Sequence, residues 1–323
     1  MPTTIISGMT AGVGGGGNVD VVPPVGQAWH IKEVTSQHAF VTNAPDVEVR
    51  IRNGAVADAI VSIDPTTSPN RKLCSYDLYI TNTNWMRLVN TGAAGGNIGH
   101  LGYRVNVNTA ICANVACGIG ATIFIQPPVG ETWVITDIGS ELWHAVNIYP
   151  DIDVGVTNGA LLLSMILSAH NARGWLAKRY QWYINNMVYI RVTNTNAAAN
   201  AVGYTGFRTG VTAISSIQTV GIGATLDVRP LANTEWVLTE FAAEIFAGAG
   251  PPADAPDIMV SLATGAGPTL SELLEPGSIA VSLRWNYPIE FPIDNTNWIR
   301  ITNVNAATNQ VGVLGYLKRT YSI

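Results

Sequence analysis

Short stretches of the chain alternate between apolar and polar residues, as a half-buried β-strand requires. In YIRVTN at 189–194, the tyrosine, arginine and threonine fall on one face, and the isoleucine and valine fall on the other. WIRITN at 298–303 repeats this alternation, and WVITDIGSELW at 133–143 is rich in β-branched and aromatic residues. Clusters of Gly, Pro and Asn separate the runs. The pattern predicts an all-β chain built from antiparallel sandwiches or jelly rolls.

A proline element that ends in tryptophan recurs three times and is the first of three landmarks. It reads PPVGQAW, PPVGETW and RPLANTEW, and it ends at Trp29, Trp133 and Trp236, which lie 104 and 103 residues apart. The third copy reads as having one extra residue between its proline and its tryptophan. Because proline cannot donate to a strand ladder, the element is typical of a strand start. We expect the tryptophans to be core anchors between two sheets, and the alternative is an exposed binding role.

Two further landmarks follow in the same order in each copy. The second is an aromatic residue, any residue and an arginine on a strand that runs into an Asn turn, and its members are Trp85, Tyr189 and Trp298 with Arg87, Arg191 and Arg300. The third is a Gly-x-x-Gly-aromatic close that ends at Tyr103, Phe207 and Tyr316. Each arginine shares a face with its aromatic, so it could stack on the ring, form an ion pair between units, or lie on a solvated face.

The landmarks divide the chain into three tandem β-sandwich units at 1–108, 109–212 and 213–323. The first unit begins with a Gly-rich arm that contains GVGGGG. The sequence TAI stands at both joints, and no Pro-rich or Gly/Ser-rich linker separates the units. We therefore expect the units to pack closely, either as a block with pseudo-threefold symmetry, since three fused copies can imitate a trimer, or as a linear row.

Composition favours a protein that assembles. Charged residues make up 12 % of the 323 residues, against about 25 % in a typical globular protein. The polar surface must then come from Asn, Thr, Ser and Gly, which tolerate burial against a neighbour. The net charge of −5 and the lack of a basic run disfavour nucleic-acid binding. The N-terminus has no signal-peptide pattern, and no apolar run reaches the length of a membrane span, so we expect a soluble protein made in a cytoplasm.

The sequence offers little that indicates catalysis or cofactor binding. The five histidines stand at no shared landmark, and no H-x-x-x-H or C-x-x-C pair, nucleophile elbow or phosphate-binding loop is present. We therefore predict no enzyme activity, no cofactor and no catalytic, cofactor-binding or metal-binding residue. Loop acids could hold calcium, but their spacing is no motif; they are Asp151, Asp153, Asp254 and Asp257. We expect buried free thiols, with a Cys112–Cys117 cross-link left open, among Cys74, Cys112 and Cys117.

The three landmarks resemble those of tandem β-sandwich virion proteins of tailed phages and thermophilic viruses. There a PPxG strand start and an R-V-T-N ending followed by G-Y-x-G recur in short jelly-roll modules, and the resemblance covers all three units. It implies a capsid, decoration or turret protein with no catalytic residues to carry over. The expected partners are the protein itself and other virion proteins, with no nucleic acid and no membrane. The expected location is the virion, after synthesis in a host cytoplasm.

Other functions stay open at this stage. Sugar-binding β-sandwiches also occur in tandem and expose aromatic residues, so a carbohydrate-binding module that contacts host-surface glycans is the main alternative. A subunit of an extracellular filament, joined by donated edge strands, is another. A hydrolase is the weakest alternative, because it would need two acids about 5–9 Å apart in a cleft.

Overall fold

The chain folds into strands throughout the part that the computed structural model describes. The described residues are 4–38, 47–56, 58–64, 71–92, 95–140, 150–159, 165–171, 181–195, 199–245, 258–264, 270–274, 284–303 and 309–320. Within these ranges every regular element is a β-strand, and the strands pair with one another in antiparallel fashion. The predicted all-β class is confirmed. No helix in the described part could cross a membrane.

Unit 1 is a sandwich of eight strands. Its junction sheet, named for the contacts described below, has the order β1-β8-β3-β6, and its second sheet has the order β2-β7-β4-β5. The strands are β1 (Ile5–Val13), β2 (Asn18–Val21), β3 (Ala28–His38), β4 (Val47–Arg52), β5 (Ala59–Asp64), β6 (Arg71–Thr81), β7 (Trp85–Asn90) and β8 (Gly96–Val105).

Units 2 and 3 repeat this order strand for strand. The junction sheet of unit 2 is β9-β16-β11-β14 and its second sheet is β10-β15-β12-β13, while unit 3 has β17-β24-β19-β22 and β18-β23-β20-β21. In unit 2 the strands are β9 (Ala110–Cys117), β10 (Thr122–Ile125), β11 (Thr132–Ser140), β12 (Pro150–Thr157), β13 (Met165–Asn171), β14 (Trp182–Ile184), β15 (Tyr189–Asn194) and β16 (Asn200–Thr209). In unit 3 they are β17 (Ala213–Val220), β18 (Thr225–Val228), β19 (Thr234–Ile245), β20 (Ile258–Thr264), β21 (Leu270–Leu274), β22 (Arg284–Asp294), β23 (Asn297–Asn303) and β24 (Asn309–Thr320).

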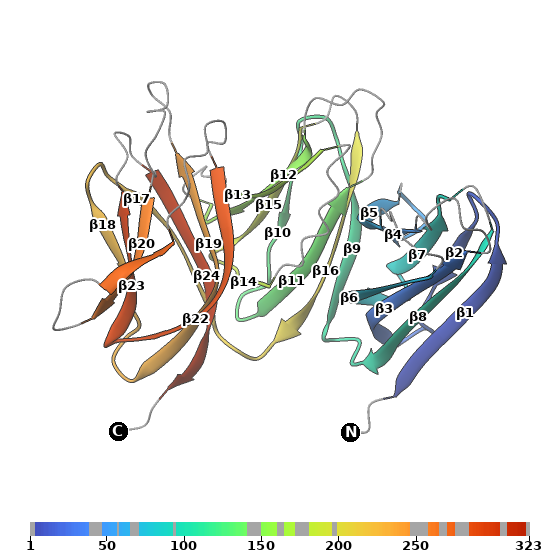
Figure 1. The fold of residues 1–323 in the computed structure, drawn as a ribbon, viewed down its shortest axis with the longest axis horizontal. Coiled ribbons are helices and arrows are strands. Elements are labelled where there is room, and N and C mark those ends of the chain that lie inside the picture. The colour runs from blue at the N-terminus through green and yellow to red at the C-terminus, as the bar shows by residue number, and fades with distance from the viewer. Residues whose placement is uncertain are drawn as a thin grey trace.

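This strand order makes each unit a jelly roll. Numbered within a unit, the sheets read 1-8-3-6 and 2-7-4-5, which is the order that two Greek keys produce in an eight-stranded double sheet. The three jelly rolls lie in a row with unit 2 in the middle, and both chain ends lie on the same side of that row (Figure 1). Of the two arrangements expected from the repeats, the chain adopts the linear row.

The proline element forms the turn that enters the third strand of each unit. Gln27 N–H donates to Pro24 O at 3.0 Å, and Gly26 has a φ of 76°, as the third position of a type II turn requires. In unit 3 the same bond joins Thr234 N–H to Leu231 O at 3.1 Å, and Asn233 takes the glycine's place with a φ of 63°. The third copy therefore has no extra residue. It has leucine at the position of the second proline.

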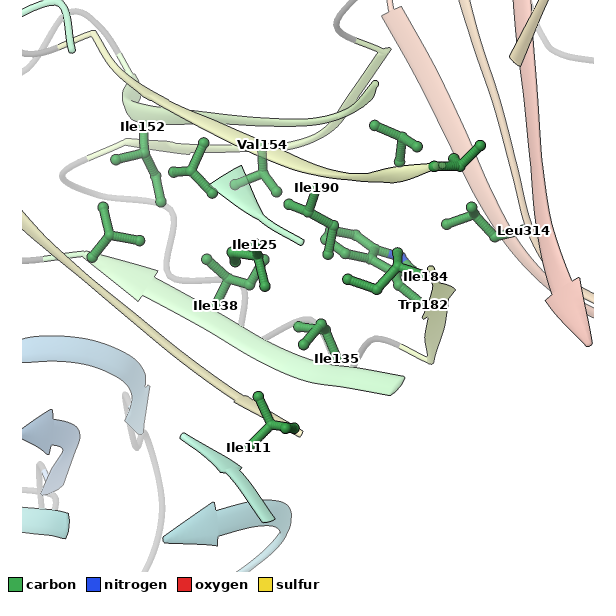
Figure 2. Packing of buried hydrophobic residues seen from close by; sticks show 14 of the residues in the cluster. Ile111, Ile125, Ile135, Ile138, Ile152, Val154, Trp182, Ile184, Ile190 and Leu314 are labelled. Carbon is green, nitrogen blue, oxygen red and sulfur yellow. The ribbon is translucent and has the colours of Figure 1, made fainter. Parts of the chain in front are cut away.

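Each unit has its own apolar core between its two sheets. The largest cluster, in unit 2, is shown in Figure 2, where Ile135 and Ile138 of β11 face Ile152 and Val154 of β12. The landmark tryptophans pack against the core of their own unit but are only half-buried, and they are Trp29, Trp133 and Trp236. Two of these indoles keep a polar partner at the rim, since Trp133 Nε1 donates to Glu131 Oε2 at 2.7 Å and Trp29 Nε1 to Gln27 Oε1 at 3.4 Å.

A β-bulge in the third strand of each unit explains why the second glycine of the third landmark recurs in all three copies. The bulges lie between Ile31 and Glu33, between Ile135 and Asp137, and between Leu238 and Glu240. Opposite each bulge, a Cβ on the landmark glycine would collide with a backbone carbonyl of the bulged strand, and the glycines are Gly102, Gly206 and Gly315. Only glycine allows this close approach.

Candidate functional site: the unit junctions

The junction between units 1 and 2 covers the free edge of a sheet. Strand β6 ends the junction sheet of unit 1, so its outward N–H and C=O groups have no strand beside them. Thr205 of unit 2 satisfies two of these groups, because its Oγ1 accepts from Tyr79 N–H and donates to Tyr79 O, both at 2.7 Å. Thr136 Oγ1 donates to a third, Asp77 O, at 2.9 Å. Two threonine hydroxyls thus take the place of a neighbouring strand.

The junction between units 2 and 3 uses the same positions. Thr239 Oγ1 donates to Gln181 O at 2.9 Å, and both residues occupy the places that Thr136 and Asp77 have one unit earlier. An aromatic pair stands beside each of these bonds. The rings of Tyr79 and Phe207 lie 5.2 Å apart, and those of Tyr183 and Tyr316 lie 4.6 Å apart. The aromatic residue of the third landmark therefore receives an aromatic side chain from the preceding unit.

The bulge aims these threonines at the preceding unit. Thr136 and Thr239 are the extra residues of the bulges in β11 and β19, where a bulge redirects the side chain. Each also donates to a carbonyl of its own unit, at Thr205 O (3.2 Å) and Leu314 O (3.4 Å). The corresponding residue of unit 1 is Lys32. In units 2 and 3 the landmark glycine thus makes room for the bulge, and the bulge directs the junction threonine toward the preceding unit.

Each junction also extends the apolar core of the preceding unit. Ile217 and Leu314 of unit 3 belong to the buried cluster of unit 2, and Figure 2 shows Leu314 beside Ile184 and Trp182. At the other junction, Cys112 of unit 2 packs against the cluster of unit 1. The following unit therefore closes the core of the unit before it. Buried apolar area stabilises such contacts by about 25 cal/mol per Å².

Direct strand pairing adds to the first junction. Ser140 of β11 pairs with Ile60 of β5, which joins the second sheet of unit 1 to the junction sheet of unit 2. The approach depends on two glycines. A Cβ on Gly139 would collide with Ile60 O, and one on Gly203 would lie 2.7 Å from the Cβ of Ala59. Glycine at these two positions lets the two units approach this closely.

A buried asparagine that the sequence landmarks did not single out fastens the first turn of every unit. In each copy it is the last residue of the strand that carries the landmark arginine, it is fully buried, and it is Asn90, Asn194 or Asn303. Asn194 Nδ2 donates to Cys117 O and Gly118 O, both at 3.0 Å, and its N–H donates to Ala121 O at 2.9 Å. Asn90 and Asn303 make the equivalent bonds. The signal was the fixed spacing of three residues after each landmark arginine.

Two landmark arginines form ion pairs inside their own units. Arg87 holds Asp20 with two bonds, Nε to Oδ1 at 2.6 Å and Nη2 to Oδ2 at 2.7 Å. Arg300 holds Asp227 in the same way, with both bonds at 2.7 Å. The hydrogen bonds from these arginines keep the pKa of both carboxyl groups below its ordinary value. Neither arginine forms the ion pair between units that the sequence left open.

The second unit lacks this pair. Arg191 lies opposite Phe124 on the neighbouring strand, where the other copies have an aspartate. Phe124 is exposed and meets the ring of Tyr189 edge-on, with the ring centroids 5.6 Å apart. No ion pair of Arg191 is found in the described part of the chain. The aromatic residues of this landmark in the other two units are shielded from solvent. Trp298 is buried, with Arg229 Cζ 4.0 Å from the centre of its ring, and Trp85 is half-buried.

A polar cluster lies beside the first junction. His30 Nε2 is 3.0 Å from Asp77 Oδ1, Lys32 also pairs with this carboxylate, and the ring of His30 stacks on Tyr79 at 4.0 Å. Burial lowers the pKa of His30, and the bond to Asp77 opposes this only in part. Burial also acts to raise the pKa of Asp77, but the hydrogen bonds from Lys32 and His30 outweigh it and hold that pKa below its ordinary value. The histidine is therefore neutral near pH 7.

Some of the acidic and cysteine residues that the sequence left open lie outside the described residues. Among the described residues, no group of three or more His, Cys, Asp or Glu side chains could hold a metal ion. The calcium candidates Asp254 and Asp257 and the side chain of Asp151 lie outside the described residues, as does the side chain of Cys74. Cys112 and Cys117 are free thiols, which settles the open cross-link. Burial raises the pKa of both thiols.

Comparison with known proteins adds little to this picture. No protein-family model and no curated protein sequence matches the chain. Among solved structures, the chain is similar to one described as "The Triple Jelly Roll Fold and Turret Assembly in an Archaeal Virus". The alignment covers 98 % of this chain and 88 % of the other, with 12 % identity and a TM-score of 0.29. The jelly-roll assignment therefore rests on the strand order of this chain and not on that likeness.

Proposed function

We propose that the protein is a structural assembly protein, most specifically a capsid, decoration or turret component of a virion, whose three jelly rolls act as one linear block. The observation that carries the proposal is the repeated junction. Twice along the chain, the same face of one unit covers the same edge and core of the unit before it. Residues that recur in the repeats pack one unit against the next, and this arrangement favours a role in structural assembly over a role in catalysis.

Surface chemistry supports the same proposal. With 12 % charged residues, the surface repels a neighbouring copy weakly and loses little solvation energy when it is covered. Large apolar side chains also stand exposed at turn tips, among them Val25, Val129, Leu231, Ile119 and Ile222. Exposed apolar groups of this kind are typical of surfaces that meet a partner. The virion setting comes from the sequence landmarks, and enzyme activity is not part of the proposal.

Light scattering of the purified full chain tests assembly. At about 50 µM, contacts with a Kd of about 1 µM or tighter are nearly saturated, so the proposal predicts a mass many times that of one chain. A single monomeric species at this concentration, together with no regular particle in the native source, would contradict it.

A carbohydrate-binding function is less well supported. It would need the second-landmark aromatics in open grooves, whereas Trp298 is 5 % exposed and Trp85 and Tyr189 are half-buried. A glycan array with the full chain tests this alternative. Reproducible hits that are lost in a Phe124→Ala variant would support it, because Phe124 is the exposed ring beside Tyr189.

A further inference from the structure

Unit 1 exposes the surface that units 2 and 3 bury at their junctions. We define this leading face by Ile5, Met9 and Leu101, with Lys32 and Tyr103 beside them. Met9 is 78 % exposed, whereas the residues in its place are 4 % exposed at Asn114 and 6 % exposed at Ile217. Leu101 is 39 % exposed, whereas its counterparts, Thr205 and Leu314, are almost completely buried. Terminal repeats normally end on a polar face, and this one does not.

Unit 3 leaves the other half of the same interface open. We define its trailing edge by Glu290, Phe291 and Pro292 of β22, the strand at the edge of the junction sheet. Phe291 stands where unit 1 has Leu78 and unit 2 has Trp182, which are both fully buried. Phe291 is only half-buried, and its two neighbours are exposed. The core of the last unit thus lacks the cover that a following unit supplies elsewhere.

The two open surfaces are compatible at the position of the first junction's main polar contact. At the first junction, Tyr79 N–H needs the hydroxyl of Thr205, but the trailing edge has Pro292 at the tyrosine position and the leading face has Leu101 at the threonine position. A residue with no N–H would meet a residue with no acceptor, so no buried N–H is left unpaired at this position.

Charge is matched as well. Lys32 replaces the junction threonine on the leading face, and Glu290 replaces Asp77 and Gln181 on the trailing edge. The Lys32 side chain is 43 % exposed, and Glu290 is exposed. When the row is continued, the Lys32 ammonium, which also pairs with Asp77 of its own unit, meets the exposed Glu290 where a hydroxyl and a carbonyl meet inside the chain. Such a pair favours this orientation over its alternatives.

We infer that the leading face of one chain binds the trailing edge of a second copy and so continues the row of jelly rolls head to tail. This inference rests on the proposed assembly function and names its partner and surface. Because the two surfaces differ, the contact is heterologous, and it generates a ring if the rotation closes and a filament if it does not.

Three single variants of the full chain test the contact by sedimentation velocity. Met9→Asp places a charge on the leading face, and Pro292→Asp places one on the trailing edge. Met187→Asp is the matched control, because Met187 is 71 % exposed on a turn of unit 2, away from both surfaces. All three sites are exposed, so the fold tolerates the changes. We expect the first two variants to raise the concentration needed for assembly at least tenfold and the control to leave it unchanged.

Mixing the variants tests the head-to-tail direction. The Met9→Asp chain keeps its trailing edge and the Pro292→Asp chain keeps its leading face, so an equimolar mixture should form a dimer and nothing larger. If Pro292→Asp still self-associates and the mixture forms no dimer, the leading face binds itself and the inference is wrong. If both variants assemble like the wild type, the inference is also wrong, although the assembly function stands. A wild-type chain that stays monomeric at every concentration overturns both.

Discussion

The hydroxyl of Thr205 is predicted to be the main polar contact that holds units 1 and 2 together. Replacing it by valine keeps the shape of the side chain and removes both of its bonds to Tyr79, each 2.7 Å long. The N–H and C=O of Tyr79 are then buried without partners, because β6 has no further strand on that side. At about 1–3 kcal/mol for each of the two buried unpaired groups, the Thr205→Val variant should lose about 2–6 kcal/mol of stability.

Serine at the same position supplies the control. Thr205→Ser keeps the hydroxyl and removes one buried methyl group, so it should cost about 1 kcal/mol. Urea unfolding followed by tryptophan fluorescence compares the two variants. Because a three-unit chain need not unfold in one step, hydrogen exchange of the peptide that contains Tyr79 should be measured as well. Its amide should exchange at least tenfold faster in the valine variant than in the serine variant.

The reasoning would be refuted by a valine variant that is as stable as the serine variant and protects Tyr79 equally. The junction would then be held by its apolar contacts alone, among them the ring pair of Tyr79 and Phe207. Faster exchange at Tyr79 without any loss of stability would contradict the expected loss of stability, although it would still support the hydrogen bond between Thr205 and Tyr79.

Three further changes test the parts on which the junctions depend. Asn194→Ala removes two bonds to backbone carbonyls and should cost about 2–4 kcal/mol in urea unfolding, whereas the exposed Asn108→Ala should change stability by less than about 0.5 kcal/mol. Gly206→Ala drives a Cβ into Val134 O and should cost about 1–3 kcal/mol, whereas Gly210→Ala, which meets no atom within 4 Å, should be neutral; equal thermal midpoints would contradict the role given to the bulge. Because burial lowers the pKa of His30 below its ordinary 6.5, its contribution to stability is complete above that pH and is lost as the pH falls below it; His30→Gln should weaken the fall in stability between pH 7 and 5.

The jelly-roll units could be predicted because their signals are local. Alternation along a strand can be read from residues that are neighbours in sequence. The three landmarks mark the same strands in each of the three copies. The tandem landmarks also pointed to close packing, which the junctions display. The choice between a row and a pseudo-threefold block could not be made, because it depends on which face of one unit meets which edge of the next.

The junction residues escaped prediction for a physical reason. Thr136 and Thr239 sit on bulges, where the two-residue alternation of a strand breaks, so their direction cannot be read from the pattern. The partner of Arg87 was also hidden, because Asp20 lies 67 residues earlier in the chain. A comparison of NVDV, TIFI and TLDV across the copies would have indicated it, since aspartate and arginine are present together in units 1 and 3. Phenylalanine replaces the aspartate only in unit 2.

Electron microscopy of the full chain tests the central claim most directly, namely that the protein is a building block made of three jelly rolls in a row. The account predicts regular assemblies in which rod-like subunits, each with three lobes, meet end to end, both in the purified protein and in material from its native source. Isolated single chains at every concentration, or compact particles with three lobes around one axis, would contradict it.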